Sequence, residues 1–291
     1  MKVLIIGGSG FLGSYVADEL SKKKHSITIL DKKKSEYLNR NQKQVILDTK
    51  NLHKNKNILN GIDVVYFFSG MSDLNDCKHK PIETVNENIL PLVNILELCV
   101  KRNIKRFIFA STVYVNSSEG NFYKSSKIAS ESYIKEFSKN YGLKYTILRY
   151  GSIYGPRSDE KNGMYRIIKN ALTKKKLIYK GSKNSVREYI HVQDAAKASV
   201  DILNKKFLNK TIVLTGQDTI KVSELLYTIN EIMNKKLKVS FSEKKFDGHY
   251  IRSPYSFDDE VGKKYKRSTY IDIGQGLIQL IKFVKNKINK K

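Results

Sequence analysis

The chain opens with Met-Lys-Val-Leu-Ile-Ile-Gly-Gly-Ser-Gly-Phe-Leu-Gly at residues 1–13, and this stretch decides its fold. Val3 to Ile6 form an apolar run short enough for a strand buried on both faces. Three glycines follow, at 7, 10 and 13, and apolar residues then recur at helical spacing. In this context the glycines allow a tight turn, close approach of a pyrophosphate and close packing of helix on strand. The stretch therefore predicts a phosphate-binding turn, with an ordinary turn that binds nothing as the alternative.

The rest of the chain alternates between strand and helix patterns. Apolar runs predict strands over 26–30, 44–47, 62–68, 106–110, 145–148 and 211–214. Amphipathic patterns predict helices over 83–100, 123–140, 164–172, 192–203, 222–233 and 276–287. This alternation predicts an α/β fold, a doubly wound parallel sheet of the Rossmann type, with a smaller C-terminal lobe. We expect residues 1–155 plus about 190–215 to form the cofactor domain, and 156–189 plus about 216–291 the small substrate lobe.

Composition restricts the class of protein. The 291 residues carry 54 Lys and Arg against 28 Asp and Glu, a net charge of +26. The lysines are dispersed and asparagine is abundant, so a genome rich in AT explains the charge better than nucleic-acid binding does; the positive field would still attract an anionic substrate. No apolar run reaches membrane-spanning length, no signal peptide is evident and the histidines show no metal spacing. We expect a cytoplasmic protein without membrane insertion or a metal site, with Cys77 and Cys99 reduced and buried.

Asp31 favours NAD over NADP. It lies 18 residues after Gly13, at the end of the second predicted strand. An acidic side chain there can bind both hydroxyls of an adenosine ribose, and it repels the additional phosphate of NADP. Lys32 to Lys34 weaken the inference, because a neighbouring cation can accommodate a phosphate. A solvated strand end is the alternative.

Tyr123 and Lys127 are candidates for catalysis. Four residues apart on a predicted helix, they share one face. An ammonium near a phenol favours the phenolate and lowers the pKa of the tyrosine, which suits a general acid/base. Two other pairs have the same spacing, Tyr165/Lys169 and Tyr179/Lys183. Only Tyr123 follows a strand that ends in hydroxyl residues, at 111–112, and such strand ends are where parallel sheets bind ligands.

Several motifs together resemble a known family. They are the glycine turn, Asp31, Tyr-Lys-Ser-Ser-Lys at 123–127 and Arg-Tyr-Gly-Ser-Ile-Tyr-Gly-Pro-Arg at 149–157. They are similar to those of extended short-chain dehydrogenase/reductases and, more narrowly, of NAD-dependent nucleotide-sugar epimerases/dehydratases, over essentially the whole chain. The resemblance implies epimerisation of a nucleotide-activated sugar through a transient keto intermediate, in surface polysaccharide biosynthesis. It also implies a homodimer formed through the helices predicted at 83–100 and 123–140.

The resemblance also assigns site residues. The catalytic group comprises a hydroxyl, an acid/base and a lysine that anchors ribose: Thr112, Tyr123 and Lys127. The cofactor group holds pyrophosphate, adenosine ribose, the adenine edge and the rest of the dinucleotide: Gly7, Gly10, Phe11, Leu12, Gly13, Asp31, Asp48, Ser69, Gly70, Asn88 and Lys127. The substrate group contacts the sugar and grips its diphosphate: Ser111, Ser152, Arg187 and Arg252.

Departures from the family pattern narrow the chemistry. Ser152 stands where the family often has asparagine. Val113 and Tyr114 stand where sugar 4,6-dehydratases carry an Asp-Glu pair, which disfavours elimination of water. The short segment between Thr112 and Tyr123 reshapes the sugar pocket. Two alternatives stay open: a nucleotide-sugar ketoreductase or dehydrogenase, and a non-catalytic NAD- or RNA-binding protein.

Overall fold

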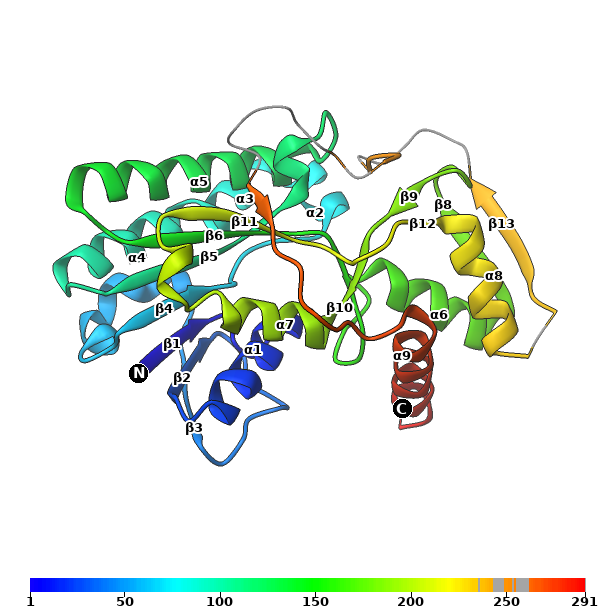
Figure 1. Ribbon diagram of the computed structural model, residues 1–291, viewed down its shortest axis with the longest axis horizontal. Coiled ribbons are helices and arrows are strands. Elements are labelled where there is room, and N and C mark those ends of the chain that lie inside the picture. Colours follow the sequence, from blue (N-terminus) through cyan, green and yellow to red (C-terminus); the bar gives the residue numbers. More distant parts are fainter. Residues whose placement is uncertain (235, 243–248, 253, 255–261, 291) are drawn as a thin grey trace.

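The centre of the molecule is an eight-stranded sheet (Figure 1). The computed structural model describes residues 1–234, 236–242, 249–252, 254 and 262–290. The strands of the sheet are β1 (Lys2–Ile6), β2 (Ser26–Asp31), β3 (Gln42–Ile46), β4 (Val64–Phe67), β5 (Arg106–Thr112), β6 (Tyr145–Tyr150), β11 (Lys210–Leu214) and β14 (Lys263–Lys264). Their order is β14-β11-β6-β5-β4-β1-β2-β3, and each neighbouring pair is parallel. The predicted doubly wound parallel sheet is confirmed.

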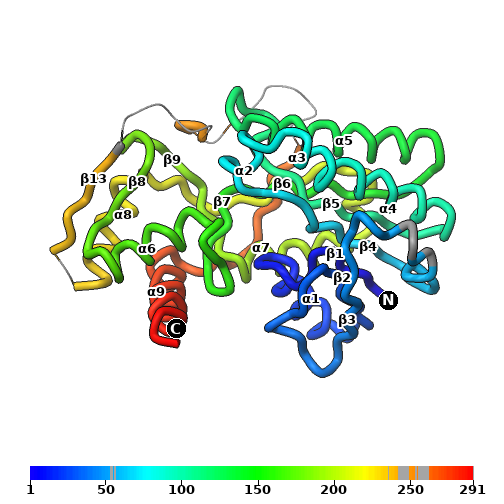
Figure 2. The backbone as a smooth tube through the Cα atoms, turned by 180° about the vertical axis from the view of Figure 1, so that it is seen from behind, coloured from blue at the N-terminus to red at the C-terminus, as the bar shows by residue number. Residues whose placement is uncertain are grey.

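Helices cover both faces of this sheet (Figures 1 and 2). One face packs against α1 (Phe11–Lys22) and α7 (Val192–Asp201), and the other against α4 (Leu90–Lys101) and α5 (Asn121–Tyr141). Along β1 the side chains alternate between these two layers, which explains the unbroken apolar run in its sequence. The two cysteines are both buried and free, as expected.

The predicted helix over 83–100 is wrong as a single element. It divides into α3 (Pro81–Asn88) and α4, with Ile89 between them. Pro91 is the physical reason: it has no backbone N–H to donate to the preceding turn, and its ring clashes with that turn. A further short helix, α2 (Leu74–His79), begins after Asp73, whose carboxylate caps it. The composition of α2 did not predict it.

The small lobe is a separate group of elements (Figure 2), and it has a hydrophobic core of its own. It contains the helices α6 (Gly163–Lys174), α8 (Val222–Ile232) and α9 (Ile273–Asn289) and the paired strands β8 (Lys176–Lys180) and β13 (Lys238–Ser242). Short strands lie between the lobes: β7 (Ser152–Tyr154), β9 (Val186–Arg187), β10 (Tyr189–His191) and β12 (Ile220–Lys221). Four 3-10 turns complete the described elements: η1 (Thr49–Lys54), η2 (Lys56–Leu59), η3 (Val113–Asn116) and η4 (Lys205–Phe207).

The chain crosses between the two parts more than once. β10 pairs with β7, α7 packs on α1, and β11 then joins β6 in the large sheet, as its sequence predicted. Later the two-residue strand β14 pairs with β11 at the edge of the same sheet, although the sequence places residues 216–291 in the small lobe. A strand of two residues has no period that a sequence pattern can reveal. None of the helices formed by the described residues is long and apolar enough to cross a membrane.

Candidate active site

The glycine turn forms a cradle at the carboxyl end of β1. Gly7 has a positive φ of 82°, and a Cβ there would lie 2.7 Å from the backbone nitrogen of Ser69. A Cβ on Gly13 would lie 2.4 Å from the carbonyl oxygen of Gly7. Real Cβ contacts are not that short, so the turn requires glycine at both positions. The helix that follows begins at Phe11, and its capping residue Gly10 provides no side-chain acceptor, so free N–H groups face the turn.

The first turn of α1 gives this cradle its affinity for anions. Phe11 and Leu12 are the first residues of the helix, and the side chains of both pack against the core. Their backbone N–H groups belong to the unsatisfied set at a helix N-terminus, where the dipole also favours negative charge. This turn therefore fits the pyrophosphate of a dinucleotide, because its glycines carry no side chain between the backbone N–H groups and an approaching phosphate.

Asp31 ends β2 beside this turn. Its carboxylate accepts hydrogen bonds from the backbone N–H of Ser9 (3.0 Å) and of Lys33 (3.2 Å). An ionised carboxylate has about four lone-pair sites, so Asp31 retains capacity for a ribose diol. Asp48 lies close by, since the preceding Leu47 donates its N–H to the Asp31 carbonyl. The Asp48 side chain accepts from the N–H of Lys50 and caps η1.

The loop after β4 lies against the glycine turn through Ser69. The next residue, Gly70, has a φ of 139°, and a Cβ there would lie 2.6 Å from the Oδ1 atom of Asn88. Asn88 is buried, and its amide accepts from the Met71 N–H (2.6 Å) and donates to the Met71 carbonyl (3.0 Å) and to the Ser126 hydroxyl (2.9 Å). Both amide hydrogens of Asn88 are therefore used inside the protein. The geometry makes Asn88 a clamp that ties this loop to α5.

Thr112, Tyr123 and Lys127 come together at the carboxyl end of β5. Thr112 is the last residue of that strand; its hydroxyl accepts from the N–H of Tyr114 (3.3 Å) and lies near Tyr123 on the first turn of α5. Lys127 lies one turn later, buried, with Nζ 5.8 Å from the centre of the Tyr123 ring. Its ammonium donates to the carbonyl oxygen of Ala110 (2.8 Å) and lies 4.6 Å from the centre of the Phe109 ring.

The pKa values of this group are set mainly by burial. Burial raises the pKa of Tyr123 to about 12, and the nearby Thr112 hydroxyl, which favours the phenolate, offsets only part of that rise. Burial also lowers the pKa of Lys127 to about 8, against the opposing charge of Glu131. The expectation that Lys127 lowers the pKa of Tyr123 is therefore wrong for this structure. The physical reason is that the ammonium is seated on the Ala110 carbonyl rather than on the phenol oxygen.

Ser111 faces away from the position that its predicted substrate role requires. Its hydroxyl is buried and donates to Oε1 of Glu131 at 2.5 Å. Glu131 also binds the guanidinium of Arg149 in a buried ion pair. Sequence reasoning did not select Glu131 or Arg149. The available signal was a carboxylate four residues after Lys127, on the buried face of the same helix.

The predicted substrate residues of the small lobe lie around β9 and β10. Ser152 is paired with Tyr189 through β7 and β10. Arg187 is buried, so it is not a surface residue of a basic chain. Its guanidinium donates to two backbone carbonyls, one of them of Ile251, and to the hydroxyl of Tyr179. Arg252 follows Ile251 directly and is exposed.

Aromatic side chains connect Arg187 with the catalytic candidates. The guanidinium lies 4.4 Å from the centre of the Tyr250 ring, and that ring lies 4.8 Å from the ring of Tyr114. Tyr114 in turn meets Tyr123 edge to face, with 6.3 Å between the ring centres. The sequence showed Tyr114 only as a departure from the dehydratase pattern. Its contact with Tyr250 joins segments too distant in the chain for any local pattern to reveal.

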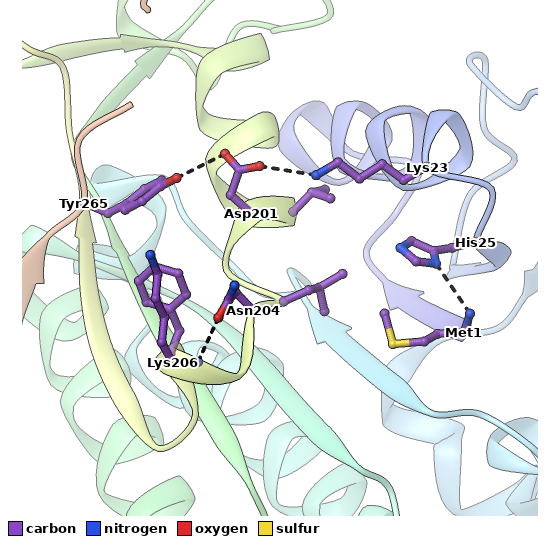
Figure 3. A pocket seen from close by; sticks show the side chains of 10 residues that line it. Met1, Lys23, His25, Asp201, Asn204, Lys206 and Tyr265 are labelled. Carbon is purple, nitrogen blue, oxygen red and sulfur yellow. Dashed lines mark hydrogen bonds and ion pairs between the residues drawn. The ribbon is translucent and has the colours of Figure 1, made fainter. Parts of the chain in front are cut away.

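A surface pocket of about 510 Å³ lies away from these residues (Figure 3). Its lining includes Asp201, which accepts from Lys23 (3.3 Å) and from the hydroxyl of Tyr265 (3.3 Å). Met1 and His25 also line it, and they directly precede β1 and β2. The pocket is therefore at the amino ends of these strands, whereas parallel α/β sheets bind ligands at the carboxyl ends.

Metal chemistry has no preformed centre in the part of the chain that the structure describes. Within residues 1–234 and the later described segments, no three His, Cys, Asp or Glu side chains are grouped to hold a metal ion. The residues described above place the candidate active site at the edge of the sheet where β1, β2, β4 and β5 have their carboxyl ends.

Comparison with known proteins agrees with this geometry. Residues 3–214 match the sequence profile described as the NAD dependent epimerase/dehydratase family. The putative UDP-glucose 4-epimerase of Methanocaldococcus jannaschii is 28% identical over 98% of this chain and 98% of that protein. The UDP-N-acetyl-alpha-D-glucosaminuronate decarboxylase of Bacillus cytotoxicus is 29% identical over 82% of each. The crystal structure of UDP-glucuronic acid 4-epimerase from Bacillus cereus, in complex with UDP-glucuronic acid and NAD, has the same fold. Its TM-score is 0.87 at 21% identity, covering 99% of this chain and 100% of that one.

Proposed function

Since the chain belongs to the NAD-dependent epimerase/dehydratase family, we propose that it epimerises the sugar of a nucleotide sugar with NAD as its cofactor. The observation that carries the proposal is the gathering of Thr112, Tyr123 and Lys127 at the carboxyl end of β5. This group lies at the same edge of the sheet as the glycine cradle. A dinucleotide in the cradle and a sugar at Tyr123 would then share one site.

The cradle and its neighbours would hold the cofactor. The backbone around Gly7, Gly10 and Gly13 would receive the pyrophosphate, and Asp31 the adenosine ribose. NAD is favoured over NADP because Lys32, the first cation after Asp31, lies 3.6 Å from the carboxylate of Glu87 and is partly neutralised by it. When bound, NAD supplies a hydride acceptor that later returns the hydride.

The residues of the chain would handle the proton. As its phenolate, Tyr123 would take the proton of a sugar hydroxyl and become a neutral phenol, while the adjacent C–H bond gives up its hydride to the bound dinucleotide, which would leave a ketone. The Thr112 hydroxyl would orient that sugar hydroxyl, and Lys127, one turn after Tyr123 on α5, would anchor the ribose of the dinucleotide beside it. After the keto-sugar turns over, Tyr123 returns the proton as the hydride comes back to the other face, so the net reaction consumes neither proton nor electrons.

The substrate class follows from Arg187 and from the relatives. A guanidinium suits a diphosphate because its planar fork can bind two oxygens at once. Both curated relatives carry names of UDP-sugar enzymes. A UDP-sugar is therefore the first substrate class to test.

A homodimer is part of the same proposal. Apolar side chains are exposed on three helices that pack on one another, α3, α4 and α5. They are Ile82, Val85, Leu90, Phe122, Ile128 and Tyr133. Ile82 is 77% exposed, which is unusual for isoleucine unless a partner covers it.

The function is tested by incubating the purified full chain with UDP-glucose, UDP-N-acetylglucosamine and UDP-glucuronic acid. We expect one of them to yield its epimer by NMR, with no net change in reduced nicotinamide and with NAD released on denaturation. Tyr123→Phe should retain the bound NAD and lose turnover. Stoichiometric reduction or oxidation of added cofactor would instead identify a dehydrogenase or ketoreductase, and full activity of Tyr123→Phe would reject the mechanism.

A further inference from the structure

Glu131 is a buried carboxylate that the proposed chemistry does not use. It lies on α5 four residues after Lys127 and is 4% exposed. Its Oε1 atom accepts from the Ser111 hydroxyl (2.5 Å) and from Nε of Arg149 (3.0 Å). Its Oε2 atom accepts from Nη2 of Arg149 at 2.7 Å. A carboxylate with a two-point contact to a guanidinium is held in one orientation.

These bonds join the elements that carry the catalytic candidates. Lys127 donates to the carbonyl of Ala110, and four residues later on the same helix Glu131 accepts from Ser111. Successive turns of α5 thus contact successive residues of β5, and the next residue of that strand is Thr112. Arg149 adds β6 to the same group. The network therefore fixes the position of α5, which carries Tyr123 and Lys127, along the length of β5.

The charge of Glu131 acts directly on Lys127. Lys127 is buried on an aromatic ring and a carbonyl of β5, where an ammonium is poorly solvated. The titratable groups facing it are Glu131 and Tyr123 on its own helix and Cys77 on α2. Burial lowers the pKa of Lys127, and the negative charge of Glu131 is the largest effect that opposes it. Arg149 contacts both oxygens of the Glu131 carboxylate.

We propose that Glu131 is a positioning residue: held by Ser111 and Arg149, its carboxylate keeps the ammonium of Lys127 charged and seated against the strand that ends in Thr112. The inference rests on the proposed function insofar as Lys127 assists Tyr123. It does not depend on which sugar is the substrate.

The test is Glu131→Gln in the full chain, because glutamine keeps the size and can still accept hydrogen bonds but has no charge. The first readout is the titration of Lys127 by NMR of protein labelled with ¹³C at the lysine ε-carbon, the signal being identified by its loss in Lys127→Met. We expect the midpoint to fall by at least about one pH unit, as for loss of a nearby opposite charge. The second readout is turnover, where we expect little change in KM. A midpoint that falls from about 8 to about 7 lowers the charged fraction of Lys127, and with it kcat, about twofold at pH 7 and about fivefold at pH 8.

Glu136→Gln is the matched control. It makes the same substitution on the exposed face of the same helix, and it should change neither readout. Glu131→Asp, which keeps the charge, should leave the Lys127 midpoint near its native value and restore much of kcat. A folded Glu131→Gln with an unchanged Lys127 midpoint would overturn the proposal.

Glu131→Gln removes the carboxylate that neutralises the buried guanidinium of Arg149 and can unfold the chain for that reason. The double variant Glu131→Gln/Arg149→Met removes both charges together. The Lys127 midpoint should still fall in it, though by less than in the single variant, because the Arg149 charge that is lost as well repels the same ammonium; an unchanged midpoint overturns the proposal here too. If the chain turns over no nucleotide sugar, the proposed function fails, while the lysine titration still decides the role of Glu131.

Discussion

The hydroxyl of Tyr114 lies 2.6 Å from Nδ1 of His249, although 135 residues separate the two in the chain. Tyr114 belongs to η3, which begins directly after Thr112, and His249 opens the described segment 249–252, next to Tyr250. The bond therefore fastens the segment that contacts Arg187 to the chain that follows Thr112 at the end of β5. In the proposed function the nucleotide sugar lies between Arg187 and Tyr123, so this bond would close its site.

Tyr114→Phe removes this bond and keeps the ring that packs on Tyr250. A hydrogen bond between neutral side chains contributes about 1 kcal/mol, so we expect KM for the nucleotide sugar to rise about fivefold with kcat little changed. Steady-state kinetics with the substrate identified above provide the measurement. A drop in kcat at constant KM would show that Tyr114 acts on the chemistry and not on closure. Tyr133→Phe, on an exposed part of α5, is the control.

Gly7→Ala should lose the cofactor as well as stability. A positive φ costs a side chain about 1–2 kcal/mol, and the clash with the Ser69 backbone adds about 1–3 kcal/mol of overpacking. Gly142→Ala is the control, since Gly142 has a φ of 70° but nothing within 4 Å of its Cβ position. We expect a smaller drop in Tm for Gly142→Ala and full retention of copurified NAD. Equal loss of NAD in both variants would contradict a special role for the cradle.

Lys127→Met should stabilise the protein at neutral pH while abolishing turnover. The pKa of Lys127 is about 8 in the folded protein against 10.5 as the ordinary value, so burial of the charge opposes folding. Below pH 8 both states carry the proton and the full penalty of about 3 kcal/mol applies. Between about pH 8 and 10.5 only the unfolded chain binds the proton. The free energy of unfolding of the wild type therefore rises with pH relative to that of the variant.

Urea unfolding of both proteins at pH 7 and near pH 10 provides the measurement. The variant also loses the hydrogen bond to Ala110, which reduces its gain by about 1 kcal/mol. We therefore expect its free energy of unfolding to exceed that of the wild type by about 2 kcal/mol at pH 7. That advantage should be largely gone near pH 10. A difference in the free energy of unfolding that does not change with pH would show that Lys127 is not a buried charge.

Ile82→Glu should convert the proposed dimer into a monomer. A carboxylate in an apolar interface is desolvated without a partner, which a dimer of ordinary size does not tolerate. Light scattering after size-exclusion chromatography gives the mass of each species. Tyr227→Glu is the control, because Tyr227 is 67% exposed on α8 in the other lobe. A wild-type chain that is monomeric at all concentrations would remove the dimer from the proposal.

Local patterns were sufficient for the strand-turn-helix unit at residues 1–22 and for the end of the second strand at Asp31. They also placed Tyr123 and Lys127 on one helix face behind a hydroxyl-ending strand. Each of these features depends on neighbours within a few residues, and a buried parallel strand shows its nature as an unbroken apolar run. Pro91 was a visible signal for the break between α3 and α4.

The remaining features of the site depend on contacts between distant segments. The Ser111 hydroxyl donates to Glu131, which also binds Arg149, because β5, α5 and β6 meet there. The side-chain amide of Asn88 is fully used by its hydrogen bonds with Met71 and Ser126. Arg187 lies beneath Tyr250, and burial rather than Lys127 sets the pKa of Tyr123. The sequence thus predicted which side chains lie at the carboxyl ends of the strands. Only packing decided which of them are used up inside the protein and which of them face a substrate, because desolvation and hydrogen-bond partners depend on segments 20 to 135 residues away.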